Sequence, residues 1–520
     1  MKIVTVLLVS IISCCVCAQT FQKKIDFESS TFGLKLAPTP DGGYIFAGAT
    51  PFAVPGNGAL VKLDASGDVQ WSKLVMPPSQ AEAVALYSIV TTRDGGYAAT
   101  GYTNTDGVLD IWIIKFTALG EVEWNTSFGS DGNDVGYSII QTQDGGYAVT
   151  GYAQPNGSLL PVIIKVDPNG TIQWDVAISG TAEGSFATSI IELQDSTLLI
   201  TGGSGLPAAF VVSLKPNGTP LWRKVIASIV CTGWNITETP DHAVIMCGGQ
   251  NQSYYLVKFT FTGFIEWTKI VNPLGFGMAR SVLVQPDGTL VVAGSFSQEF
   301  NAPESDSLAI FSLTPTGTLK SFQVMTLPFK RSEGFSMNST SDGGFILGGF
   351  TADAQTRFSL LLSRFDSLEY NCFMQNHLVS ISEGGVVTDS TISVIFGPPL
   401  RTIGKPTIVP TTVTVTDLCA MSAPDDNPLR KDHSVVISPN PITASILSLH
   451  IPGEIPTGNY ILFLRDALGK EVHREKKYLN GAEITIPIQV SDLPVGVYTV
   501  DLLDANTFTS IYHSKVVKIK

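Results

Sequence analysis

Residues 144–153 read DGGYAVTGYA, and fifty positions earlier residues 94–103 read DGGYAATGYT. Complete or degenerate copies of this motif begin at seven aspartates, which are Asp41, Asp94, Asp144, Asp195, Asp241, Asp287 and Asp342. By subtraction, successive aspartates are 53, 50, 51, 46, 46 and 55 residues apart. A self-similar period of this length is typical of a repeat architecture in which each unit is one supersecondary element.

Each unit contains four short runs of β-forming residues. In the third unit these runs are YSIIQT, YAVTGYA, PVIIKVD and TIQWDVAIS. Asp-Gly-Gly separates the first two runs and Pro-Asn-Gly the last two, and both are turn signals because glycine accepts positive φ. Four antiparallel strands in 46–55 residues form one propeller blade, near the kelch period. The sequence therefore predicts an all-β fold with a seven-bladed β-propeller over residues 19–372.

A tryptophan begins the fourth run in five of the units. These residues are Trp71, Trp124, Trp174, Trp222 and Trp267. A large ring at a shared position is expected to pack between neighbouring blades. The alternative is a set of platforms on which sugar rings stack.

The seventh unit lacks a clear fourth run. Residues 21–27, which precede the first unit, read FQKKIDF and resemble the fourth-run starts WSKLV, WRKVI and WTKIV. We expect this segment to complete the last blade and close the ring, which would remove the exposed sheet edges that invite aggregation.

Length and composition set the class of protein. With 520 residues, 44% hydrophobic and 15% charged, the chain is globular and long enough for two or three domains. A net charge of −13 argues against binding to nucleic acid or to an anionic membrane surface. The same acidity also serves solubility.

The first 18 residues have the pattern of a secretory signal peptide. One lysine is followed by an apolar run over 3–12 and by Val16-Cys17-Ala18, so cleavage is expected after Ala18. The apolar run is too short to span a bilayer, and no later stretch is long and apolar enough, so no transmembrane segment is predicted. Four cysteines follow the signal: Cys231, Cys247, Cys372 and Cys419. Export permits the disulfides 231–247 and 372–419, and four buried thiols are the alternative.

Three segments follow the repeats. Residues 373–420 contain further β-type runs that do not match the repeat, and we expect a β-rich extension that packs on the propeller or bridges from it. Residues 421–434 are polar with two prolines and predict a linker. The alternation in residues 435–520 predicts a small β-sandwich of about seven strands.

Two parts of the chain resemble known families. The DGGY repeat, with its following K-x-D-x-x-G-x-x-x-W phrase, resembles repeats of exported β-propeller proteins of the Bacteroidetes type over residues 21–372. Residues 435–520 resemble the type A C-terminal sorting domain of type IX secretion cargo. The residues that carry this second resemblance include Pro439, Asn440, Pro441, Gly469, Lys470, Gly496, Tyr498, Lys515 and Lys518.

The sorting resemblance implies a route and a partner. It implies passage through the periplasm, transport across the outer membrane by the type IX secretion machinery, removal of the tag, and release or attachment at the cell surface. Gly469 and Gly496 stand where turns need positive φ. The basic end, with Lys515 and Lys518, suits an acidic receptor surface. The alternative is that these are ordinary sandwich residues.

The sequence predicts no catalytic residue, no cofactor and no metal site. Only His242 of six histidines lies inside the repeats, which argues against a histidine metal cage or a Ser-His-Asp triad there. Carboxylate pairs of the glycosidase kind remain an alternative, with Asp110, Asp134 and Glu183 near unit ends. One slot of the third run is cationic in five units, at Lys62, Lys115, Lys165, Lys258 and Arg364. This ring of cations either binds an anionic polymer or pairs with acids of neighbouring strands.

The leading interpretation is a non-enzymatic exported propeller that binds a polysaccharide or a surface protein through loops at one face. Exposed aromatic residues there, among them Tyr102, Trp112 and Trp234, would favour binding. A carbohydrate-active enzyme and a passive surface-coat protein are the alternatives.

Overall fold

The computed structural model describes two compact units, Met1–Leu418 and Cys419–Lys520. The described residues run from 20 to 518, apart from 28–29, 51–55, 78–82, 106, 180–183, 204–207, 228–230, 251–252, 274, 298–306, 326, 328, 356, 367–373, 377–378, 384–385, 390–392, 396–405, 412, 419–435, 439–445, 452–456, 467–470, 481, 483 and 505–509. Apart from single-residue assignments, strands and the short 3-10 turn η1 (Pro155–Gly157) are the regular structure of this part of the chain. None of its helical residues forms a helix of the length and apolar character that a membrane crossing requires.

In the first unit each sequence repeat folds into an antiparallel sheet of neighbouring strands. The first four repeats form the strands β2 (Phe32–Pro38), β3 (Tyr44–Ala49), β4 (Gly58–Leu63), β5 (Val69–Met76), β6 (Ala83–Thr91), β7 (Tyr97–Thr105), β8 (Val108–Phe116), β9 (Val122–Phe128), β10 (Val135–Gln141), β11 (Tyr147–Ala153), β12 (Leu160–Val166), β13 (Ile172–Ser179), β14 (Phe186–Glu192), β15 (Leu198–Gly203), β16 (Ala208–Leu214) and β17 (Pro220–Ala227).

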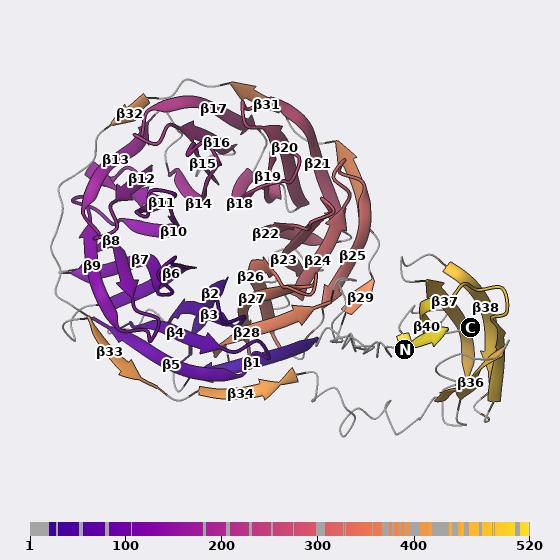
Figure 1. Cartoon of the computed structure of the whole chain (residues 1–520). Coiled ribbons are helices and arrows are strands. Elements are labelled where there is room, and N and C mark those ends of the chain that lie inside the picture. The colour runs from indigo at the N-terminus through magenta and orange to yellow at the C-terminus, as the bar shows by residue number, and fades with distance from the viewer. Residues whose placement is uncertain are drawn as a thin grey trace, which may run out of the picture. The chain divides into compact units, whose positions relative to one another are not determined.

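The remaining repeats continue the same order. Their strands are β18 (Cys231–Glu238), β19 (Ala243–Gln250), β20 (Ser253–Thr260), β21 (Ile265–Pro273), β22 (Phe276–Val284), β23 (Leu290–Ser297), β24 (Ser307–Leu313), β25 (Leu319–Met325), β26 (Arg331–Ser339), β27 (Phe345–Ala352) and β28 (Phe358–Phe365). The sheets stand around a common axis with the first strand of each innermost, which is a β-propeller (Figure 1). One residue pair, Gly203 with Thr232, links the fourth and fifth sheets.

The N-terminal strand β1 (Phe21–Phe27) closes the ring. It pairs antiparallel with β28, from Phe21 opposite Arg364 to Ile25 opposite Leu360. Ile25 is fully buried. The prediction that residues 21–27 complete the last repeat is therefore confirmed.

Neighbouring sheets meet through the ring at the start of the fourth strand. A methyl group placed on Gly120 would lie 2.7 Å from the Trp71 ring, and one on Gly170 would lie 2.5 Å from Trp124. Both glycines have positive φ in the turn of the next sheet. The indole N–H of Trp174 also donates to the Pro216 carbonyl of the next sheet at 3.0 Å. Packing of these tryptophans between sheets is therefore confirmed.

Phe21 takes the corresponding place at the last junction. Its ring would lie 2.7 Å from a methyl group on Gly67, in the turn of the first sheet. The side chain is only 4% exposed. The junction between the last and first sheets therefore repeats the five tryptophan junctions, with phenylalanine in place of tryptophan.

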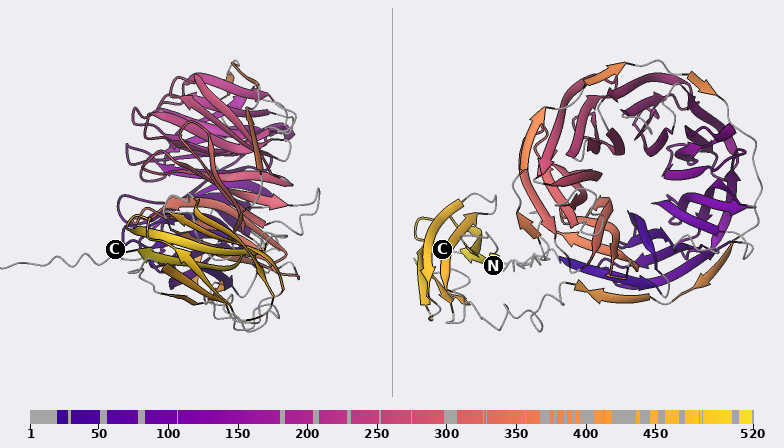
Figure 2. Two further views of the ribbon diagram at one scale, coloured as in Figure 1. Left: turned by 90° about the vertical axis from the view of Figure 1, so that its right-hand side faces the viewer. Right: turned by 180° about the vertical axis from the view of Figure 1, so that it is seen from behind.

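The segment after the repeats forms a belt around the rim of the propeller. Its strands are β29 (Met374–Asn376), β30 (Val379–Glu383), β31 (Val386–Asp389), β32 (Ser393–Ile395), β33 (Thr407–Pro410) and β34 (Val413–Asp417). They pair in turn with β25, β21, β17, β13, β5 and β1. The belt thus runs around the ring against the order of the repeats, as the orange strands at the rim show (Figures 1 and 2).

The belt covers outer sheet edges that would otherwise be open to another chain. Val413 and Val415 pack against the core that contains Ile25, and Leu418 is buried beyond the last belt strand. In the described part of the chain, β9 of the second sheet receives no belt strand. The β-rich extension expected from the sequence is thus distributed over the ring, one strand to a sheet, and forms no separate layer.

One of the two disulfides that export permits, 231–247, does not form. The strand register places Cys247 opposite Asn235, whereas Cys231 lies opposite Gln250 at the far end of the same strand pair. Cys247 is a free, fully buried thiol, and burial raises its pKa. Cys372 and Cys419 lie outside the described residues.

The second unit consists of two antiparallel sheets. One contains β35 (Val436–Ser438), β36 (Ile446–Ile451) and β39 (Ile484–Gln489), and the other contains β37 (Gly458–Asp466), β38 (Glu471–Leu479), β40 (Gly496–Asp504) and β41 (Ser510–Lys518). Leu449 and Ile486 of the first sheet share one buried core with Leu462 and Val500 of the second.

Replacement of Phe21 tests the closure of the ring. Phe21→Ala should lower the free energy of unfolding of the first unit by roughly 3 kcal/mol, because a buried phenyl ring leaves a gap between two sheets. Urea titration followed by tryptophan fluorescence measures this unit alone, since all seven tryptophans precede residue 418. Phe264→Ala, which removes a ring that is 69% exposed, is the matched control. Equal losses in the two variants would contradict this role of Phe21.

Candidate functional site

A β-bulge occurs at the same place in the innermost strand of every repeat unit. The register skips one residue between Leu86 and Ser88, for example, and again between Gly136 and Ser138. The skipped residues, which we call the bulge residues, are Leu34, Tyr87, Tyr137, Thr188, Trp234, Arg280 and Phe335. A bulge re-aims a side chain, and the repetition of the bulge aims one side chain per sheet at the axis.

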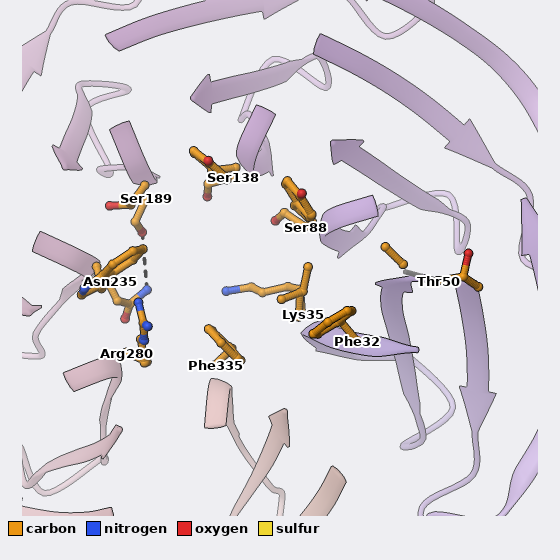
Figure 3. A pocket seen from close by; sticks show the side chains of 15 residues that line it. Phe32, Lys35, Thr50, Ser88, Ser138, Ser189, Asn235, Arg280 and Phe335 are labelled. Carbon is orange, nitrogen blue, oxygen red and sulfur yellow. Dashed lines mark hydrogen bonds between the residues drawn. The ribbon is translucent and has the colours of Figure 1, made fainter. Parts of the chain in front are cut away.

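The bulge residues line one cavity of about 350 Å³ on the propeller axis (Figure 3). All of the innermost strands contribute to its wall, because each bulge residue belongs to a different sheet. Polar side chains at the next position, among them Ser88, Ser138, Ser189 and Asn235, complete the lining. The wall therefore combines five aromatic rings with hydroxyl, amide and basic groups.

The aromatic side chains hold one another in place. Tyr87 stacks on Tyr137 with ring centroids 5.6 Å apart, and Phe186 lies 6.2 Å from both Tyr137 and Trp234. Burial raises the pKa of Tyr87 and of Tyr137, so both hydroxyls stay neutral. The aromatic part of the wall is thus preformed and uncharged.

The residue after the bulge normally joins adjacent sheets. It is serine or asparagine in six units: Ser88, Ser138, Ser189, Asn235, Ser281 and Ser336. Ser281 Oγ accepts from the Met337 backbone N–H of the next sheet at 3.1 Å, and Asn235 Oδ1 accepts from that of Val282 at 3.1 Å. The small polar residue therefore has a structural role in the ring.

In the first sequence repeat, the residue after the bulge is Lys35. Its side chain extends into the cavity, towards the side on which Asn235 and Arg280 lie (Figure 3). Among the described side chains it has no hydrogen-bonding or ion-pair partner. Burial lowers the pKa of the Lys35 amine. Lys35 therefore places a basic amine in the cavity where the other repeats have a small neutral side chain.

Arg280 is the charged member of the bulge residues. Its guanidinium carbon lies 4.1 Å from the Trp234 ring centroid and 5.3 Å from that of Phe335. The buried Glu333, which also binds Arg331, lies 3.6 Å from Arg280 Nη2. Two cation–π contacts and this carboxylate fix the guanidinium in the cavity wall.

The five repeat cations have another role. Each pairs with the aspartate of the Asp-Gly-Gly turn or its equivalent in its own sheet, as in Lys62–Asp41 at 2.8 Å and Lys115–Asp94 at 2.9 Å. The remaining pairs are Lys165–Asp144, Lys258–Asp241 and Arg364–Asp342. Structural pairing is therefore confirmed, but mainly with acids of the turn; Lys115 and Lys258 also pair with Glu123 and Glu266 of the neighbouring strand. These cations are separate from the cavity.

The glycines of the repeated phrase allow this pairing. Gly95 has a φ of +82°, and a methyl group on Gly96 would lie 2.6 Å from Lys115 Nζ. In the worn fourth and fifth units, Ser196 and His242 take the positive-φ position instead. The repeated phrase thus marks a turn and its ion pair, and does not mark a binding site.

Neither described acid of the three considered from the sequence lines the cavity. Asp134 Oδ1 accepts from Ser130 Oγ at 2.8 Å and from the Gln154 backbone N–H at 2.7 Å, which makes Asp134 an organiser of its loop. Asp110 is fully buried, and Glu183 lies outside the described residues. In the described part of the chain, no three residues among His, Cys, Asp and Glu are grouped so that they could hold a metal ion.

The three aromatic residues expected to be exposed lie in different environments. Trp234 lines the cavity. Trp112 is fully buried, and its indole N–H donates to Asn125 Oδ1 at 3.1 Å. Tyr102 is only 6% exposed and packs edge-on against Tyr87. The expectation for Trp112 and Tyr102 was wrong because neighbouring sheets cover both faces of this sheet: Trp112 packs in a core with the first sheet, and Tyr102 packs with Val135 of the third.

The sorting-signal residues that are described have structural contacts. Tyr498 is buried, and its hydroxyl donates to the Pro494 carbonyl at 2.6 Å. The buried amine of Lys518 donates to the carbonyls of Val490, Ser491 and Leu493. Gly496 begins β40 opposite Lys518 and lacks the positive φ expected of it, because it lies in a strand and not in a turn. Lys515 lies opposite Thr499. Pro439, Asn440, Pro441, Gly469 and Lys470 lie outside the described residues.

No protein-family model matches the sequence, and no curated protein is significantly similar to it. Solved structures that resemble it include a protein of unknown function from Dyadobacter fermentans, which is 9% identical with a TM-score of 0.40 and covers 67% of this chain and 98% of its own. A protein of unknown function from Bacteroides caccae is 13% identical with a TM-score of 0.32, over 48% and 93% of the two chains. Sqt1 of Chaetomium thermophilum bound to the N-terminus of ribosomal protein L10 is 10% identical with a TM-score of 0.36, over 64% and 96%. At such identities a likeness concerns the fold alone.

The cavity residues are hard to find in the sequence because the units align most clearly on their turns. Alignment on the first strand instead shows YSI at 87–89 and 137–139, WNI at 234–236 and LKL at 34–36. The lysine at the serine position is visible in this alignment. That the skipped residues face one cavity depends on the bulge, which the sequence does not reveal.

The turn ion pair predicts a dependence of stability on pH. Burial tends to raise the pKa of Asp94, but hydrogen bonds from Thr92 and Lys115 lower it by more. The net result is a pKa of about 2, down from 3.8. A carboxyl with a depressed pKa stabilises the fold above its unfolded pKa, and this contribution is lost as the pH falls through the folded value. Asp94→Asn should therefore lower the Tm at pH 7, and its difference from the wild type should shrink between about pH 4 and pH 2.

Differential scanning calorimetry across this pH range measures the effect. Asp167→Asn is the control, because Asp167 accepts from two backbone N–H groups of its turn and forms no ion pair with a described residue. A difference for Asp94→Asn that stays constant from pH 7 to pH 2 would exclude the proposed contribution of the carboxylate.

Proposed function

We propose that this protein is an exported β-propeller that binds a glycan in the axial cavity without cleaving it. The observation that carries the proposal is the wall of aromatic, hydroxyl and basic side chains, to which every repeat unit contributes. Ligand sites in proteins are concave and mainly apolar, with a few placed polar groups. The site differs from the one expected from the sequence, since it is formed by inner strands and not by loops at one face.

The lining argues against glycoside hydrolysis. Glycosidases place two carboxyl groups about the scissile bond. No aspartate or glutamate is among the described residues that line the cavity. Binding without catalysis is therefore the better interpretation of this site, ahead of a carbohydrate-active enzyme or a passive coat protein.

The architecture and the boundaries belong to the same proposal. We infer seven blades, because the seven repeat units each supply one sheet, with β1 completing the last. The shared core of the two C-terminal sheets supports a β-sandwich. The proposed domains are a signal peptide at 1–18, the propeller at 19–372, the belt within 373–420, a linker at 421–434 and a sorting domain at 435–520.

The signal peptide and the sorting resemblance support export by the type IX machinery, through the periplasm to the outer surface or the medium. Deletion of 435–520 should leave the protein in the periplasm, which cell fractionation and immunoblotting would show. Lys35→Ser, which keeps the sorting domain, is the control and should be exported normally. Unchanged export of the truncated chain would exclude the sorting role.

A polysaccharide pull-down tests the binding proposal. The wild-type protein should be retained, the supernatant should contain no released oligosaccharide, and Trp234→Ala should be retained at least about tenfold less well because the aromatic wall is broken. Phe264→Ala removes an exposed ring elsewhere and is the matched control. Released oligosaccharide would favour the enzyme, and no retention would favour a protein ligand or a coat role.

A further inference from the structure

We propose that the ligand of the axial cavity is an acidic sugar, a uronic acid unit of a glycan, whose carboxylate binds Lys35. Arg280 forms the positively charged wall on the side towards which Lys35 extends (Figure 3). This inference rests on the proposed function and narrows it to one class of glycan.

The first support is the departure of Lys35 from the repeat. Ser88 and Asn235, at the same position of other units, accept hydrogen bonds from the Ile139 and Val282 backbones. A lysine at this position does not form the hydrogen bond to the next sheet, and it places an amine among aromatic rings. A partly desolvated cation without a carboxylate partner destabilises the empty protein. An anionic ligand removes that cost.

The second support is the state in which Arg280 is held. The rings of Trp234 and Phe335 both contact the guanidinium, which fixes the plane of the group. A fixed guanidinium is well suited to a carboxylate, because its N–H groups form a planar fork. Glu333 approaches Arg280 and also binds Arg331, so it does not cancel the charge of both cations of the cavity.

The charge of the cavity contrasts with that of the whole protein. The net charge is −13, and the cations of the repeat slot are paired with turn aspartates, as in Lys62–Asp41. Lys35 and Arg280 are outside that pairing pattern and lie in one cavity. A positive cavity in an acidic protein favours an anion over a cation or a neutral ligand.

The size and lining favour a sugar unit over a protein partner. A cavity of about 350 Å³ is at the small end of ligand sites. A stable protein interface needs about 800 Å² on each partner, which a cavity of this size does not offer. Flat rings such as Tyr137 and Trp234 suit the C–H faces of a sugar, and Ser138 and Ser189 offer hydrogen bonds to its hydroxyls.

Isothermal titration calorimetry of the full mature chain tests the proposal. The probes are oligomers of galacturonate, glucuronate, mannuronate and guluronate, each beside its carboxyl-reduced neutral form. At least one acidic oligomer should bind about tenfold or more tightly than its neutral form, because a charge-assisted hydrogen bond is lost on reduction.

Three variants identify the group that binds the carboxylate. Lys35→Ser restores the residue type of the other units, so it should fold, and it should lower affinity for the acidic oligomer about tenfold or more. Lys35→Arg keeps the charge and should keep most of the affinity. Lys215→Ser removes an exposed lysine outside the cavity and should have no effect. Circular dichroism confirms that each variant is folded.

The outcomes separate this inference from the proposed function. Equal affinity for acidic and neutral forms, or unchanged affinity in Lys35→Ser, would overturn the acidic-sugar inference and leave glycan binding standing. Binding of neutral glycans alone would do the same. Absence of binding to every glycan, with binding of an acidic peptide instead, would overturn both.

Discussion

Closure of the ring by β1 is the constraint on which the rest of the propeller depends. At five junctions between sheets a tryptophan ring packs on a glycine turn of the next sheet, as Trp71 does on Gly120. The last junction lacks such a tryptophan, and Phe21 supplies the ring. Without β1 the strand β28 would have an open edge, and the inner strands would not be held around a common axis. The cavity, which takes one side chain from every sheet, exists only in the closed ring.

The repeat provides a standard against which single residues can be judged. The turn aspartate, the cation of the third strand and the serine after the bulge have the same structural role in unit after unit, so their presence says little about activity. A residue whose type differs from that of its equivalents in the other repeats is more informative about function. Lys35 lacks the hydrogen bond to the next sheet that Asn235 forms, and Arg280 places a positive charge among aromatic rings. Both departures lie in the same cavity, which is why it is the strongest candidate site in the described part of the chain.

The sequence predicted what depends on local chemistry. Turn residues indicated the strands and the period, and the resemblance of FQKKIDF to WTKIV indicated the closure. It did not predict the bulges, because a one-residue slip in register depends on the partner strand. Cys247 was misjudged for the same reason, and Trp112 was misjudged because the neighbouring sheet covers its face of the blade. The belt was missed as a ring because three- to five-residue strands such as β29 carry too little pattern to name the sheet with which they pair.

The belt also fixes when the fold can be completed. β1 lies between β28 and β34, with Lys23 opposite both Leu362 and Asp417, so residues 394 positions apart (417 minus 23) share one ladder. This five-stranded sheet cannot be completed on a chain whose synthesis has not passed the belt. Such high contact order makes folding slow, since distant segments must meet before their pairing stabilises them. The propeller therefore completes its folding late, because β1, the first strand to be synthesised, pairs with β34, which is synthesised after all the repeats.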